Sequence, residues 1–156
     1  MLAEQLHVIP GLTSADHAAG VDSESINMGY LHEVLALLQI GSITVADAVV
    51  KVYSGASAGT KTTAEVFRYR KSGAAAKSAS ADVWAAWTTA VAATGIVLSN
   101  ANDDNFLYEI EIESDEMTAG QPWLTIEIAA GATVLQGAIV FVGRGRFQAN
   151  AVPTAI

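Results

Sequence analysis

The sequence predicts an all-β protein: an antiparallel β-sandwich with jelly-roll-like connections, or a barrel, formed by one domain. Three observations predict this fold class. Apolar and polar residues alternate with period two, short extended segments are separated by Gly-, Ser- and Asn-rich turns, and 51% of the 156 residues are apolar. A chain of this length and composition can bury a core without disulfides, and it contains no cysteine.

Taken in chain order, residues 1–25 are expected to form an N-terminal arm or loop, because PGLTSADHAAGVDSES (10–25) is rich in small and polar residues. One β-rich domain is expected over 26–156, with an apolar tail over 148–156 in which Pro153 discourages sheet pairing. The extended segments expected in this domain are 31–40, 48–53, 64–70, 96–99, 106–113, 123–128 and 135–142.

The clearest alternation lies in FLYEIEIE and PWLTIEI. The faces expected to point inward carry Phe106, Tyr108, Ile110 and Ile112 in the first segment, and Leu124, Ile126 and Ile128 in the second. The opposite faces carry Glu109, Glu111 and Glu113, expected to be solvated, and Trp123, Thr125 and Glu127. The linker SDEMTAGQ, with Gly120, predicts a hairpin between the two segments.

The segment 82–93 is ambiguous, because Trp84, Trp87 and Val91 have helical spacing whereas its threonines favour a strand. We expect at most one short helix there. The net charge of −8 disfavours a nucleic-acid partner, which would require a basic surface. The most apolar run, 34–50, is interrupted by polar residues and is too polar for a membrane span, and MLAEQLHV lacks the cationic start of a secretory signal.

Motifs of catalysis are incomplete. GASAG (55–59) matches a nucleophile elbow centred on Ser57, but the following TAEVFRYR predicts a strand instead of a helix. All three histidines precede Ser57, which excludes the α/β-hydrolase order of the triad. The same glycine-rich stretch lacks the Gly-Lys pair of a phosphate loop, and HEVLA has Ala36 where a zinc protease needs its second histidine. The stretch predicts a flexible hairpin turn.

Two acidic patterns could carry chemistry. Asn100, Asn102 and Asp104 alternate as calcium-loop ligands do, but Asn105 stands where the loop needs glycine, so a polar turn is favoured over an ion site. Glutamates at i and i+2 on a strand are roughly 6.5–7 Å apart, a separation compatible with glycosidase carboxylates. A general acid needs a buried environment, however, and a row of glutamates favours a solvated face. We therefore expect no catalytic residue, metal or cofactor.

Other residues favour contact over catalysis. FRYRK places Phe67 and Tyr69 on one face and two arginines on the other, and the acidic row could pair with those arginines within one sheet or between subunits. For the tryptophans, core packing and an interface both remain open. The candidate interface residues are Arg68, Arg70, Trp84, Trp87, Glu109, Glu111, Trp123, Arg144, Arg146, Pro153 and Ile156.

Four segments together resemble the capsid decoration (cement) proteins of tailed bacteriophages. They are SINMGYLHEVLALLQIGSI, VVKVYSGASAGTKTTAEVFRYRKS, TAGQPWLTIEI and GRGRFQANAVPTAI. The resemblance implies a β-rich virion protein without catalytic residues, which binds the major capsid protein on the outer capsid surface as a homo-oligomer, with a trimer favoured. It also implies synthesis in the host cytoplasm and no nucleic-acid or membrane partner. The alternatives are a neck or tail component, or a carbohydrate- or host-surface-binding module that uses Trp123.

Overall fold

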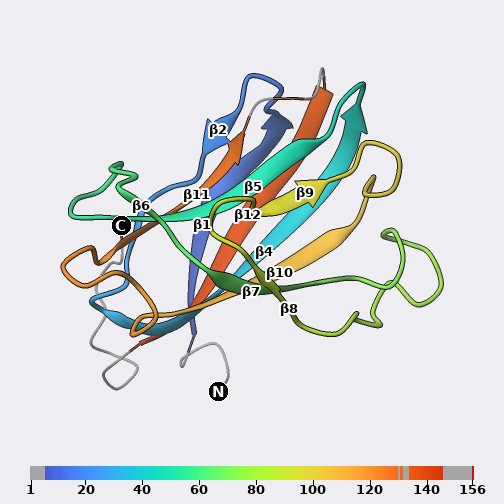
Figure 1. Cartoon of the computed structure of the whole chain (residues 1–156). Coiled ribbons are helices and arrows are strands. Elements are labelled where there is room, and N and C mark those ends of the chain that lie inside the picture. Colours follow the sequence, from blue (N-terminus) through green and yellow to red (C-terminus); the bar gives the residue numbers. More distant parts are fainter. Residues whose placement is uncertain (1–5, 130, 132–133, 146–155) are drawn as a thin grey trace.

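The computed structural model describes residues 6–129, 131, 134–145 and 156. In this part of the chain every regular element is a β-strand, and two antiparallel sheets pack against each other (Figure 1). The predicted all-β sandwich is therefore confirmed. Among the same residues, no helix has the length and apolarity that crossing a membrane requires.

Each sheet contains six strands, and all pairings are antiparallel. Sheet A has the order β1 (Leu6–Asp16), β12 (Val134–Gly145), β4 (Leu31–Thr44), β10 (Leu107–Glu113), β7 (Phe67–Lys71) and β8 (Thr88–Ala90). Sheet B has the order β2 (Val21–Asp22), β11 (Trp123–Ala129), β5 (Ala48–Gly55) and β6 (Thr63–Ala64). In addition, β3 (Ile26–Asn27) pairs with β11, and β9 (Ile96–Leu98) pairs with β5.

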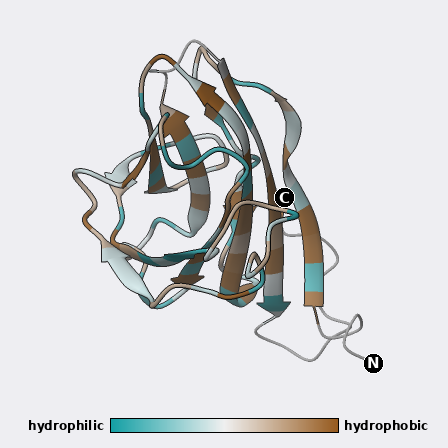
Figure 2. Cartoon of the chain, turned by 90° about the vertical axis from the view of Figure 1, so that its right-hand side faces the viewer, coloured by the Kyte–Doolittle hydropathy of each residue, from teal (hydrophilic) through white to brown (hydrophobic). Residues whose placement is uncertain are grey.

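The core lies between the sheets and follows the predicted alternation, which is visible as apolar bands along the strands in Figure 2. Tyr108, Ile110 and Ile112 are at most 3% exposed, and Leu124, Ile126 and Ile128 are fully buried. Phe106 lies one residue before β10 and is half-buried. Alternation identifies the inward face because successive side chains of a strand point to opposite sides.

The N-terminal segment is where the sequence-based expectation was wrong. Residues 6–16 do not form an irregular arm: they form β1, an edge strand of sheet A that pairs with β12. Register shifts follow Pro10 and Leu12, as expected where proline and glycine interrupt a ladder. At Gly11 an added Cβ would overlap the ring of the buried Phe141, so the absent side chain leaves room for the core. Because Pro10 and Gly11 are typical of loops, the sequence pattern did not predict this strand.

One further expectation is corrected, and the ambiguous segment 82–93 is assigned. The linker after Glu113 does not close a hairpin, because β10 lies in sheet A and β11 in sheet B, so this segment passes between the sheets. Segment 82–93 contains β8 and an isolated bridge between Trp84 and Ser72, with no helical turn. By contrast, the turn at Ser57 does connect a hairpin, since β5 pairs with β6.

Candidate functional site

The outer face of sheet A, which points away from the core, carries its side chains in three cross-strand rows. The pairing registers align them as Arg70–Glu109–Leu37–Val140–Pro10, Arg68–Glu111–Leu35–Val142–Val8, and Glu113–Glu33–Arg144–Leu6. Cross-strand neighbours on one face lie within contact distance. The first two rows therefore divide this face into an ionic half over β7 and β10 and an apolar half over β4, β12 and β1. The third row adds the charged Glu33 and Arg144 at one end of the apolar half.

The ionic half pairs the two arginines of FRYRK with the acidic row inside one sheet, which is one of the two arrangements left open by the sequence. Arg70 Nε forms an ion pair with Glu109. Arg68 Nη2 lies 2.8 Å from Glu113 Oε1 and 3.6 Å from Glu111 Oε1. The expected solvated row is wrong for Glu109, which is only 8% exposed. The ion pair with Arg70 compensates the Glu109 carboxylate for its lost hydration.

Arg70 is also held between two indole rings. Its guanidinium carbon lies 4.8 Å from the ring centroid of Trp84 and 4.6 Å from that of Trp87, within cation–π range. Neither tryptophan belongs to the hydrophobic core, and Trp87 remains 41% exposed. The bridge between Ser72 and Trp84 attaches segment 82–93 to the end of β7 and so positions the rings. Trp84 and Trp87 therefore lie at the protein surface and not in the core.

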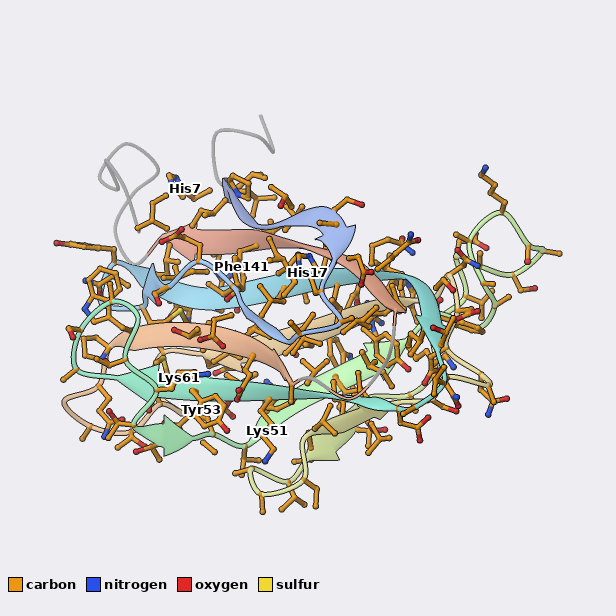
Figure 3. The ribbon with its side chains drawn as sticks, turned by 90° about the horizontal axis from the view of Figure 1, so that it is seen from above. His7, His17, Lys51, Tyr53, Lys61 and Phe141 are labelled. Atoms are coloured by element: carbon orange, nitrogen blue, oxygen red, sulfur yellow. The ribbon has the colours of Figure 1, made fainter. Side chains whose placement is uncertain are left out.

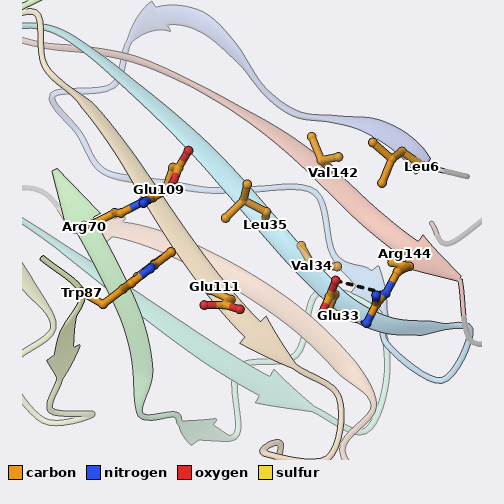
Figure 4. A pocket seen from close by; sticks show the side chains of 10 residues that line it. All are labelled: Leu6, Glu33, Val34, Leu35, Arg70, Trp87, Glu109, Glu111, Val142 and Arg144. Carbon is orange, nitrogen blue, oxygen red and sulfur yellow. Dashed lines mark hydrogen bonds and ion pairs between the residues drawn. The ribbon is translucent and has the colours of Figure 1, made fainter. Parts of the chain in front are cut away.

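The apolar half is partly open to solvent. Val8 is 64% exposed and Val140 is 37% exposed, while Leu35, Leu37 and Val142 are half-buried. Single exposed valines are ordinary on protein surfaces, whereas contiguous apolar rows are typical of contact sites. At the junction of the two halves lies a shallow hollow of about 350 Å³ (Figure 4). It is lined by Leu6, Glu33, Val34, Leu35, Arg70, Trp87, Glu109, Glu111, Val142 and Arg144.

The structure brings seven of the candidate interface residues to this face or its border. Arg144, on the apolar side of the hollow, pairs with Glu33 at 3.1 Å, a partner that the sequence did not suggest. Trp123 lies in sheet B, half-buried, with Asn27 and Gly55 as its cross-strand neighbours. Ile156 is 54% exposed. Arg146 and Pro153 lie outside the described residues.

The outer face of sheet B carries a smaller polar cluster (Figure 3). Lys61 Nζ lies 2.8 Å from Asp22 and 3.0 Å from Glu127, and 5.6 Å from the ring centroid of Tyr53. Desolvation, followed by the Glu127 carboxylate, raises the pKa of Tyr53. Although desolvation acts to lower the pKa of Lys61, its hydrogen bonds with Asp22 and Glu127 hold it above the ordinary value. The cluster is internally paired and links β2, β11 and the β5–β6 hairpin.

The loop at Asn100–Asp104 turns its carboxylates toward the protein. Asp104 Oδ1 accepts a hydrogen bond of 2.7 Å from the Ile43 amide. Asp103, 5% exposed, forms an ion pair with Lys71 and accepts from the Ser99 amide. Burial, together with Asp103, holds the pKa of Tyr108 far above its ordinary value. These carboxylates anchor the loop to β4 and β7.

Ser57, the candidate nucleophile that we rejected, lies in an exposed turn in which Thr60 Oγ1 donates to its carbonyl oxygen at 2.6 Å. This contact closes the β5–β6 turn. Among the described residues no group of three or more His, Asp or Glu side chains is arranged to hold a metal ion.

The apolar half of sheet A was not predicted from the sequence, because residues 6–16 were expected to form an arm and not the strand β1. The signal for this strand is the alternation of Leu6, Val8 and Pro10. It is easily missed, because a proline followed by a glycine, as at Pro10 and Gly11, is more typical of a loop. No family model, curated protein or solved structure significantly matches this chain.

Proposed function

We propose that this chain is a structural protein of a tailed-bacteriophage virion: a capsid decoration protein that attaches through the outer face of sheet A. The observation that carries the proposal is the partly exposed apolar half of this face, beside the paired charges of β7 and β10. An apolar centre with a polar border is the usual anatomy of a protein interface. The class of partner, the major capsid protein, is what the sequence resemblance implies.

The mechanism is adhesive. A partner that covers Val8 and Val140 removes their exposed apolar surface from water, which contributes roughly 25 cal/mol for each Å² buried. Trp87, at 41% exposure, adds a large flat ring of the residue type that dominates binding energy at interfaces. A subunit that contacts two neighbouring capsomers in this way opposes their separation. Assembly as a homo-oligomer, with the trimer favoured, would multiply these contacts.

Capsid binding tests the proposal. Purified protein is mixed with capsids that lack decoration, and bound protein is measured by co-sedimentation over a concentration series. We expect saturable binding that Val8→Asp weakens strongly, because the new carboxylate would be desolvated at the interface. The matched control is Val97→Asp, which changes a 54% exposed valine in sheet B. Absence of saturable binding, or equal effects of the two variants, would contradict the proposal.

The same assay separates the alternatives. A neck or tail component would co-sediment with those assemblies and leave capsids bare. A carbohydrate- or host-surface-binding module would give a selective glycan-array signal. For that module, Trp87 is a better candidate than the predicted Trp123, since Trp87 is the more exposed ring and borders the hollow.

A further inference from the structure

Glu111 is the least well paired carboxylate of the hollow. Glu109 has Arg70, and Glu33 lies 3.1 Å from Arg144. Among the described residues, the ion-pair partner of Glu111 is Arg68, at 3.6 Å, and that arginine makes its shorter contact with Glu113. The Glu111 side chain is 28% exposed, so solvent supplies the remaining stabilisation of its charge in the free protein.

The surroundings of Glu111 combine an apolar floor with an aromatic wall. Leu35 and Val142 follow Glu111 in the same cross-strand row, and Trp87 lies on the side of β7 (Figure 4). Glu33 and Arg144 close the opposite side. The hollow therefore offers a carboxylate, an aliphatic surface and a partly exposed indole ring together.

A partner that covers this face with apolar atoms alone would remove Glu111 from water and leave it only the 3.6 Å contact with Arg68, which Arg68 shares with Glu113. Burying a charge that is weakly paired carries a desolvation cost, which would offset part of the gain from the apolar rows. A partner that supplies a positive charge at Glu111 avoids this cost. The chain's net charge of −8 would attract such a partner at long range.

We propose that the hollow receives a lysine side chain of a partner protein. The lysine ammonium pairs with the Glu111 carboxylate, its aliphatic stem lies along Leu35 and Val142, and the ring of Trp87 provides a cation–π contact. If the proposed function holds, this lysine belongs to the capsid surface. Recognition of the lysine depends only on the hollow.

The direct test is an NMR titration of the full chain with N-acetyl-lysine-methylamide, alongside the norleucine analogue, which keeps the aliphatic stem and lacks the ammonium. We expect saturable shifts of the Trp87 indole N–H and the Glu111 amide, with a Kd on the order of 1 mM, as one partly solvated contact allows. The norleucine analogue should produce no saturable shift. Equal responses to both probes, or no localised response to lysine, would overturn the proposal.

Variants assign the effect to Glu111. Glu111→Gln should weaken lysine binding about fivefold, which equals about 1 kcal/mol. The control is Glu127→Gln, because Glu127 is 26% exposed, is also an outward strand residue and lies in sheet B. Trp87→Leu supplies a second variant that leaves the charges unchanged and should also weaken binding. Urea midpoints establish that each variant is folded. Unchanged affinity in Glu111→Gln would refute the role of this carboxylate.

Capsid binding by the same variants distinguishes this inference from the proposed function. If lysine binds at the hollow but capsids do not bind the protein, the inference stands and the decoration function fails. If capsids bind both wild-type protein and Glu111→Gln equally and the lysine probe does not bind, the decoration function stands and the inference fails.

Discussion

Replacing Arg70 by methionine tests whether the ionic half of sheet A is a structural element or a solvated surface. Arg70 pairs with Glu109, whose side chain is 10% exposed, and Arg70 itself is 29% exposed. Arg70→Met retains an unbranched apolar stem and removes the guanidinium. The change leaves the Glu109 carboxylate mostly buried without its cation, and it also removes the charge held between Trp84 and Trp87.

The expected loss of stability follows from these contacts. Breaking a fully buried ion pair by removing one partner costs about 3–5 kcal/mol, and the partial exposure of this pair reduces that to about 2–3 kcal/mol. Two cation–π contacts at partly exposed sites add about 0.5–1 kcal/mol each. The free energy of unfolding should therefore fall by about 3–5 kcal/mol. With an m-value of about 2 kcal/mol/M, the urea midpoint should fall by about 1.5–2.5 M.

Equilibrium urea unfolding, followed by tryptophan fluorescence and circular dichroism, measures this change. The control is Arg68→Met: Arg68 is 41% exposed and its partners Glu111 and Glu113 are 28% and 33% exposed, so its loss should cost less than about 1 kcal/mol. The double variant Arg70→Met/Glu109→Leu should be more stable than Arg70→Met, because no carboxylate is left unpaired. A loss below about 1 kcal/mol in Arg70→Met would refute the reasoning.

Three further predictions concern the core, the backbone and pH. Gly11→Ala should lower the free energy of unfolding, measured in urea, by about 1–3 kcal/mol, because the new Cβ overlaps the Phe141 ring. The control is Gly137→Ala, which should be nearly neutral because its Cβ would lie 3.6 Å from the Gln39 backbone oxygen. Val45→Asn should raise stability by about 0.5–1 kcal/mol. Val45 is 77% exposed and has a φ of 75°, a conformation that asparagine adopts more readily than a β-branched residue. An unchanged or lower thermal midpoint would contradict this prediction. Above pH about 10 the unfolded state releases the Tyr108 proton while the folded state retains it, because the pKa of Tyr108 is raised in the folded state. Stability should therefore fall with rising pH. Tyr108→Phe should make that fall shallower in urea titrations between pH 9 and 11, and an identical slope would argue against the raised pKa.

Alternation made much of the fold predictable. The inward sets on β10 and β11 were identified because one buried face imposes a period of two on the sequence. The irregular elements were not predictable in the same way. Pro10 and Gly11 are typical of a loop, yet here they occupy shifts of register in β1, and Gly11 is required by the size of Phe141 on the neighbouring strand.

The candidate site was predictable in part. The sequence identified Arg68, Arg70, Glu109 and Glu111 as complementary charges because each set shares one parity of its strand. It did not identify Glu33 as the partner of Arg144, because these residues are separated by 111 positions and meet only through the register of β4 and β12. The hollow itself joins residues from several strands, and no local pattern describes it.

By itself, the sequence determined the class of the protein: an all-β chain whose period-two segments carry an apolar face that must be buried. Only the tertiary structure decided where the opposite faces lie. It placed β10 and β11 in different sheets and brought the acidic row of one strand beside the arginines of another. The physical reason is that alternation is a local property, set by the geometry of one strand, whereas strand order and register depend on contacts between residues distant in the chain.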